Sequence, residues 1–144
     1  MKKGYYLDSC IWLNLFKKEG DVSKGIPYWK IALHFIRHIE DKNRQIYVST
    51  IILKELRYIL GGKFPKILNY FKKAGFIKII KTKGEDYDLA RKLEEEDNSE
   101  ISFYDYLHVA IVKRLKCIFV TRDRDLLNFS KSKINVDLPE NLSN

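Results

Sequence analysis

The sequence has little of what several common protein classes require. It contains only two cysteines, Cys10 and Cys117, with no CxxC pair and no Cys/His zinc spacing. No continuous apolar run approaches the roughly 18 residues that a membrane span needs. Met1-Lys2-Lys3 is basic, but Asp8 interrupts the apolar segment that follows, so we expect no secretory signal. These absences predict a cytoplasmic protein without a zinc finger.

The state of the two cysteines is related to the compartment in which the protein acts. Both lie within apolar stretches, where a free thiol packs as a small hydrophobic side chain. A Cys10–Cys117 disulfide is the alternative, and the sequence leaves the redox state of the pair open. We expect free thiols, because structural disulfides are rare in a reducing cytoplasm.

Proline and glycine are also scarce, with three and seven residues in a chain of 144. No linker, internal repeat or low-complexity tract divides the sequence. Hydrophobic residues make up 45% and aromatic residues 13%, which is enough for a proper core at this length. We therefore expect residues 1–144 to form a single domain.

Positive charge exceeds negative charge. The 27 basic and 19 acidic residues leave a formal net charge of +8. If some of the acids converge on one site, the remaining surface is more basic still, which favours a polyanionic partner such as nucleic acid. A solvated, lysine-rich surface of no special purpose is the alternative, so charge alone decides little.

Short β-branched runs alternate with longer amphipathic segments. This alternation is typical of a parallel sheet that is covered by helices on both faces. A polar connector is expected at 17–26, and Ser9 is predicted to cap the first helix. The predicted strands are 4–8, 45–48, 76–80, 116–120 and weakly 134–136, and the predicted helices begin near 9, 27, 50, 65, 85, 102 and 126.

Two acids follow predicted strands. Asp8 comes directly after the first strand, and Asp123 follows the strand at 116–120 after Thr121 and Arg122. In open α/β sheets the ligand crevice lies beyond the carboxyl ends of the strands, so both side chains are expected there. Each also has an ordinary alternative, because Asp8 can begin a turn and Asp123 can cap a helix.

Glu55 lies on the apolar face of the third predicted helix, beside Ile51 and Ile52. No basic residue lies three or four positions away, so a local ion pair is excluded and a more distant group must satisfy the carboxylate. Asp105 has a stronger local explanation. It is the third residue after Ser102, as in a capping box, and its functional interest comes from the position of its helix near the crevice.

Carboxylates that converge repel one another and raise one another's pKa values unless a cation lies between them. Ligand sets made only of oxygen suit the hard cations Mg2+ and Mn2+. Such a site can polarise a phosphoryl oxygen and activate water. The four acids together therefore favour phosphodiester hydrolysis.

The ordered segments resemble the PIN-domain nucleases, and within them the VapC-like toxins of toxin–antitoxin pairs. They are Tyr6-Leu7-Asp8-Ser9, Val48-Ser49-Thr50 through Glu55-Leu56, Ser102-Phe103-Tyr104-Asp105 with Ala110, and Val120 through Leu126. The resemblance implies a three-layer α/β/α fold with a short parallel sheet of four to five strands. It also implies a Mg2+- or Mn2+-dependent endoribonuclease, an RNA substrate, a small antitoxin that inserts an arginine, and a homodimer.

Carried over residue by residue, the resemblance assigns the catalytic and metal-binding roles to four acids. These are Asp8, Glu55, Asp105 and Asp123. The resemblance also suggests Asp125, two residues after Asp123, as an auxiliary fifth acid at the metal site. Ser9 and Thr121 are expected to orient a water or a carboxylate by hydrogen bonding.

Basic residues near the acids are further candidates. Arg122 and Arg124 flank Asp123 and are placed to hold a phosphate, although a solvated loop has the same pattern. His108 shares a face with Asp105 and is expected to bond that carboxylate. His34 and His38 lie one turn apart, but with no third ligand evident we expect surface or structural roles.

Two other functions are alternatives to the nuclease. A non-catalytic RNA- or protein-binding module would keep the fold without turnover, and it differs from the nuclease in needing no response to Mn2+. A phosphotransfer domain would place acids in the same crevice. A haloacid-dehalogenase type needs an acid at position 10, where Cys10 stands, and a receiver needs paired acids after its first strand, which are not evident.

Overall fold

The computed structural model describes residues 4–143, so Met1-Lys2-Lys3 lies outside the described part of the chain. The strands are short runs of apolar residues, and most of their side chains are buried. They are β1 (Tyr5–Leu7), β2 (Ile46–Ser49), β3 (Ile77–Ile80), β4 (Ile118–Val120) and β5 (Val136–Asp137). Each lies within about two residues of its predicted position.

Seven α-helices are described between and after these strands. Ser49 and Ser102 cap α3 and α6 as predicted, and α3 ends at Gly61, whose φ of +54° suits glycine. The helices are α1 (Ser9–Phe16), α2 (Tyr28–Asp41), α3 (Thr50–Leu60), α4 (Phe64–Lys73), α5 (Gly84–Glu96), α6 (Phe103–Leu115) and α7 (Arg124–Ser130), with 3-10 turns η1 (Gly61–Lys63) and η2 (Pro139–Asn141).

The predicted cap of α1 is wrong by one residue. Asp8 is the N-cap, and its Oδ1 accepts the Ser9 amide at 2.8 Å, whereas Ser9 is already helical. An aspartate caps a helix as well as a serine does, and β1 ends at Leu7, which leaves Asp8 in the extended conformation that a cap needs.

All five strands are parallel, in the order β3-β2-β1-β4-β5. The chain moves from β1 towards β3 on one side and later returns to build β4 and β5 on the other. The direction of winding therefore changes between β1 and β4. In open α/β sheets this switch point opens a crevice beyond the strands' carboxyl ends, and Asp8 and Thr121 follow these two strands directly.

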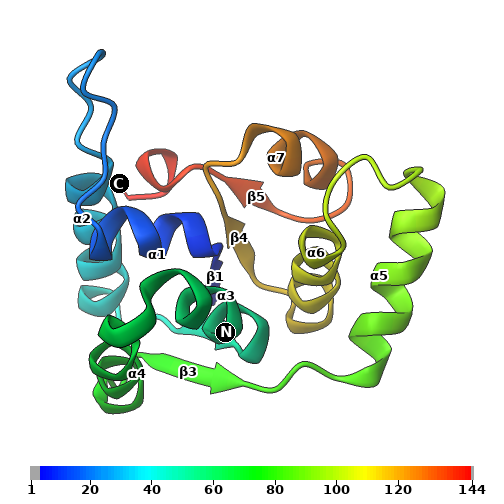
Figure 1. Ribbon diagram of the computed structural model, residues 1–144, viewed down its shortest axis with the longest axis horizontal. Helices are drawn as coiled ribbons and strands as arrows, with labels where there is room; N and C mark the ends of the chain where they lie inside the picture. The colour runs from blue at the N-terminus through cyan, green and yellow to red at the C-terminus, as the bar shows by residue number, and fades with distance from the viewer. Residues whose placement is uncertain (1–3, 144) are drawn as a thin grey trace.

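The sheet lies between two layers of helices (Figure 1). Helix α1 packs against α2 and α3, and α5 packs against α6. Most of α6 is buried, including its whole central segment 106–112, as expected for the central helix. The predicted three-layer α/β/α fold with a short parallel sheet is confirmed.

The connector, the two cysteines and the lengths of the helices also bear on the sequence predictions. The connector at 17–26 projects beyond α2 in Figure 1, and an antiparallel bridge between Asp21 and Ile26 closes it. Both cysteines are free, Cys10 in α1 and Cys117 before β4. None of the helices in the described residues combines the length and hydrophobicity needed to cross a bilayer.

Candidate metal centre

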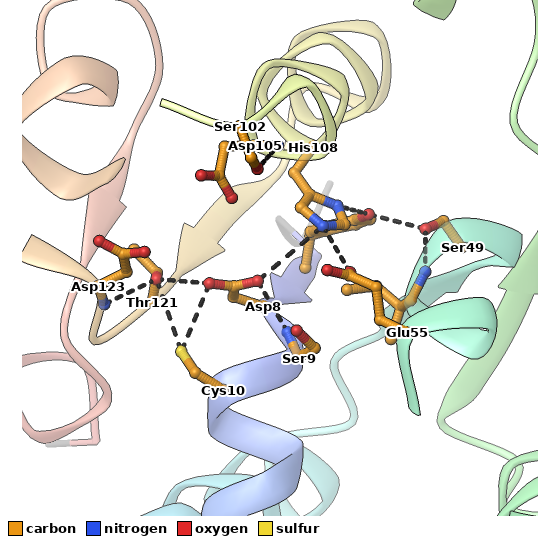
Figure 2. A network of polar contacts seen from close by, with 12 residues as sticks. Asp8, Ser9, Cys10, Ser49, Glu55, Ser102, Asp105, His108, Thr121 and Asp123 are labelled. Carbon is orange, nitrogen blue, oxygen red and sulfur yellow. Dashed lines mark hydrogen bonds and ion pairs between the residues drawn. The ribbon is translucent and has the colours of Figure 1, made fainter. Parts of the chain in front are cut away.

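Asp8 lies at the centre of a polar cluster at the switch point (Figure 2). It is 6% exposed, and its two oxygens are held separately. Oδ1 accepts the Ser9 amide at 2.8 Å, while Oδ2 accepts the Thr121 hydroxyl at 2.8 Å and the Cys10 thiol at 3.4 Å. Burial raises the pKa of Asp8, and the favourable influence of His108 and Thr121 only partly opposes this.

Glu55 is satisfied by a residue far away in the sequence, as its position on α3 predicts. Its Oε1 lies 2.8 Å from Nε2 of His108, which comes from α6. We expected His108 to bond Asp105, one turn away on its own helix. The structure shows Glu55 as its partner, because the buried ring projects from α6 towards α3.

His108 is fully buried and bonded through both ring nitrogens. Nδ1 lies 2.7 Å from the hydroxyl of Tyr6, which lies 2.7 Å from the hydroxyl of Ser49, and Ser49 in turn accepts the Ile52 amide. Burial alone would lower the pKa of His108, but the hydrogen bond and charge of Glu55, with Asp8 and Asp105, raise it. A positive charge on the ring is therefore stabilised inside the cluster.

Asp105 and Asp123 lie on the other side of Asp8 (Figure 2). Burial, followed by the charge of Asp8, raises the pKa of Asp105 to about 6, and Asp123 adds to the effect. The Ser102 hydroxyl accepts the Asp105 amide at 3.3 Å, which is the first half of the predicted capping box. Among the described contacts no return bond from the Asp105 carboxylate is present, so that carboxylate remains directed at the acids.

Asp123 caps α7, which was its ordinary alternative. Its Oδ1 accepts the amides of Asp125 and Leu126 at 3.0 and 3.2 Å. The Asp123 amide donates to the Thr121 hydroxyl at 3.1 Å, and that hydroxyl also binds Asp8. Thr121 therefore ties together the two acids that follow β1 and β4, while Oδ2 of Asp123 takes no part in the cap.

The remaining candidates lie outside this cluster. Asp125 is exposed on α7 and lines a hollow with Asp97 and Glu100. Arg122 makes two bonds of 3.0 Å to Glu140 and lies over the ring of Tyr28, so a phosphate would have to displace an existing partner. Arg124 is exposed beside it, and its phosphate-binding role stays a prediction.

The donor atoms fit a divalent cation. One ligand atom each from Asp8, Glu55 and His108 lies within 4.8 Å of the others. Among residues 4–143, these three side chains form a group that could hold a metal ion. Burial, with a smaller contribution from neighbouring carboxylates, raises the pKa values of Asp8 and Asp105, and a bound cation would favour their charged forms. Of the predicted acids, the structure brings Asp8 and Glu55 into this group.

Tyr6 was not predicted as a member of the cluster, and His108 was predicted with a different partner. Tyr6 reads as an ordinary core residue of a strand, and nothing local distinguishes it. His108 carried a signal, since a histidine in the middle of a nearly apolar helix must find a polar partner. Its partner depends on where the fold places Glu55 on α3, which periodicity alone does not give.

The fold and the cluster together define an α/β protein with an acidic site at its switch point. The sequence profile of the PIN domain matches residues 5–132. The chain therefore belongs to the PIN domain family. A search of curated proteins finds no significant match.

Several solved structures share the fold at low sequence identity. A toxin–antitoxin complex from Klebsiella pneumoniae has a TM-score of 0.67 at 15% identity, covering 94% of this chain and 98% of that one. VapBC2 from Rickettsia felis, bound to a promoter DNA fragment, has a TM-score of 0.66 at 20% identity, covering 93% of this chain and 97% of that one. VapC20 from Mycobacterium tuberculosis, a sarcin-ricin loop cleaving toxin, has a TM-score of 0.62 at 17% identity, covering 91% of this chain and 96% of that one.

Proposed function

We propose that the protein is a metal-dependent endoribonuclease that hydrolyses RNA phosphodiester bonds. The observation that carries this proposal is the position of Asp8, buried at the switch point between Thr121 and the Glu55–His108 pair. Membership of the PIN domain family and the similarity to a sarcin-ricin loop cleaving toxin support it. The net charge of +8 suits a polyanionic substrate.

In this proposal Asp8 and Glu55 hold Mg2+ or Mn2+, and Asp105 and Asp123 complete the acidic crevice. A divalent cation supplies Lewis acidity to the phosphodiester and to an attacking water. Thr121 holds Oδ2 of Asp8 in place, and the Ser9 amide holds Oδ1. The chain thus orients its central carboxylate before any substrate arrives, as preorganised sites require.

The test compares cleavage of a mixed RNA pool by the wild type and by Asp8→Asn, with Mg2+ or Mn2+ present. Asp88→Asn on α5 is the matched control, because Asp88 is an exposed acid outside the cluster. We expect cleavage by the wild type and the control, and loss of cleavage with Asp8→Asn or with EDTA. Equal cleavage by Asp8→Asn, or cleavage that survives EDTA, would refute the metal mechanism.

A non-catalytic RNA- or protein-binding module is the second candidate. It is favoured by the Glu55–His108 bond, which gives Glu55 a partner without any cation. Such a module would bind RNA and show no turnover in the same assay. Titration with Mn2+ also separates the two functions, because the nuclease is stabilised by an ion that binds the folded state and the module need not be.

We further propose that the protein is the toxin of a type II toxin–antitoxin pair and acts in the cytoplasm. The toxin–antitoxin complex from Klebsiella pneumoniae and VapBC2 support this role. The antitoxin would insert an arginine into the acidic crevice, where a guanidinium can bind carboxylates in pairs. An antitoxin-like peptide is then expected to compete with Mn2+ or RNA, and independent binding of both would contradict this.

A homodimer is part of the same proposal. Helix α3 exposes two large apolar side chains, Tyr58 at 91% and Ile59 at 48%, and such residues are common in subunit interfaces. Sedimentation of the wild type and of Tyr58→Glu tests it. We expect a dimer that Tyr58→Glu weakens, whereas a monomeric wild type would exclude the dimer.

A further inference from the structure

We propose that Nε2 of His108 is a third ligand of the cation that Asp8 and Glu55 hold, so that the centre binds Mn2+ in preference to Mg2+. The inference rests on the cation site of the proposed function and adds a nitrogen donor to it. The sequence predicted ligands that are all oxygen. The cluster observed among the described residues contains an imidazole, and that difference carries the proposal.

The spacing of the donor atoms is suitable. Nε2 of His108 lies 2.8 Å from Oε1 of Glu55 and 4.0 Å from Oδ1 of Asp8. Ligands about 2.1 Å from one ion are about 3.0 Å apart when adjacent and about 4.2 Å apart when opposite. The two measured separations, the shorter of which is also a hydrogen bond, lie near these values, and the three donor atoms lie within 4.8 Å of one another.

The ring is also oriented as a ligand needs to be. Nε2 faces the two carboxylates, and Nδ1 lies 2.7 Å from the hydroxyl of Tyr6. Histidines that bind metals usually have their second nitrogen bonded to a protein group, which fixes the ring and its tautomer. The Tyr6 hydroxyl can accept from Nδ1–H while it donates to Ser49, so Nε2 is able to present its lone pair.

Burial limits the groups that the His108 ring can contact. His108 is completely buried, and the partners of Nε2 among the described residues are Glu55 and Asp8. A lone pair directed at two carboxylates is repelled unless a cation lies between them. In the absence of metal, a proton on Nε2 removes this repulsion and is donated to Glu55. A divalent cation can take the place of that proton.

A nitrogen donor changes which cation is preferred. Mg2+ demands oxygen ligands and near-ideal octahedral geometry, whereas imidazole binds the transition metals more readily. Of the two cations that the acids suit, Mn2+ is the transition metal and gains more from His108 than Mg2+ does. The proposed preference for Mn2+ over Mg2+ therefore comes from His108 on α6, three residues beyond Asp105 on the same helix.

The test detects the nitrogen directly. Electron spin-echo spectroscopy of the Mn2+ complex is expected to show coupling to an imidazole nitrogen in the wild type, and this requires no variant to fold. The coupling should persist when His34 and His38 on α2 are both changed to asparagine and disappear in His108→Gln. Binding of Mn2+ should weaken at least about tenfold in His108→Gln, with Mg2+ affected less.

The possible failures are separable. If Mn2+ binds the wild type, and Asp8→Asn abolishes this binding, but no nitrogen coupling appears, His108 is not a ligand and the proposed cation site stands. Coupling that vanishes in the His34→Asn, His38→Asn double variant also refutes the inference. If no Mn2+ binds at all, the cation site of the proposed function fails together with this inference.

Discussion

Nε2 of His108 lies 2.8 Å from Oε1 of Glu55, and this contact joins two residues that are 53 positions apart. It links α6 to α3 through their side chains at the acidic crevice. Glu55 has no basic neighbour on its own helix, so the contact provides the partner that its position requires. The acidic site of this PIN domain is consequently held in shape by a buried histidine.

Removing the Tyr6 hydroxyl should destabilise the fold. Tyr6→Phe leaves Nδ1 of His108 without its partner and removes one contact of Ser49, and both groups are fully buried. A buried polar group left unpaired costs about 1 to 3 kcal/mol. Denaturant unfolding measures the loss. Tyr70→Phe is the control, because Tyr70 is exposed on α4 away from the cluster, and an equal effect of the two changes would contradict the role of Tyr6.

Thr121→Val should loosen the two acids that follow β1 and β4. The hydroxyl donates to Asp8 and accepts from the Asp123 amide, so valine removes both bonds at nearly constant volume. We expect Mn2+ affinity, measured by calorimetry, to fall about tenfold or more. Thr121→Ser keeps the hydroxyl and should stay near the wild type. Unchanged affinity in Thr121→Val would show that Asp8 needs no such support.

The stability of the metal-free protein should depend on pH through the cluster. The pKa of Asp105 rises from 3.8 to about 6 on folding, because burial and Asp8 disfavour its charged form. The folded state therefore binds more protons than the unfolded state between these values, and stability falls as pH rises through this window. The pKa of His108 is also raised, so its contribution is present below about 6.5 and is lost above that.

Unfolding in EDTA at about pH 4.5 and about pH 6.5 checks the first part of this prediction. Asp105→Asn has no carboxyl to titrate, so its stability should fall less than that of the wild type over the same interval. A saturating divalent cation should also reduce the slope, since it favours the charged acids. A wild-type slope equal to that of Asp105→Asn would show that Asp105 does not titrate abnormally.

The sequence was sufficient for the parts of the site that depend on local order. Asp8 directly follows one buried strand and Asp123 comes three residues after the end of another, and strands of a parallel sheet end on one side, so their convergence was predictable. The cap of α1 was misassigned because Asp8 and Ser9 are both good capping residues, and the choice depends on where β1 ends.

The other parts depend on packing between distant segments. His108 was assigned to Asp105 because both lie on one helix face, yet its ring reaches α3 instead. Arg122 is bound by Glu140 from the C-terminal segment, which the sequence did not predict, and its phosphate-binding role stays a prediction. Neither contact follows from periodicity or spacing, because each joins residues whose relative positions are set by the tertiary structure.

The carboxylates at the switch point are proposed to form a cation site, and the effect of Mn2+ on the free energy of unfolding tests that site. An ion that binds only the folded state at 100 times its Kd should raise the free energy of unfolding by about 2.7 kcal/mol. We predict this increase for the wild type and for Asp88→Asn, and none for Asp8→Asn. Equal unfolding free energies of the wild type with and without Mn2+ would contradict the account.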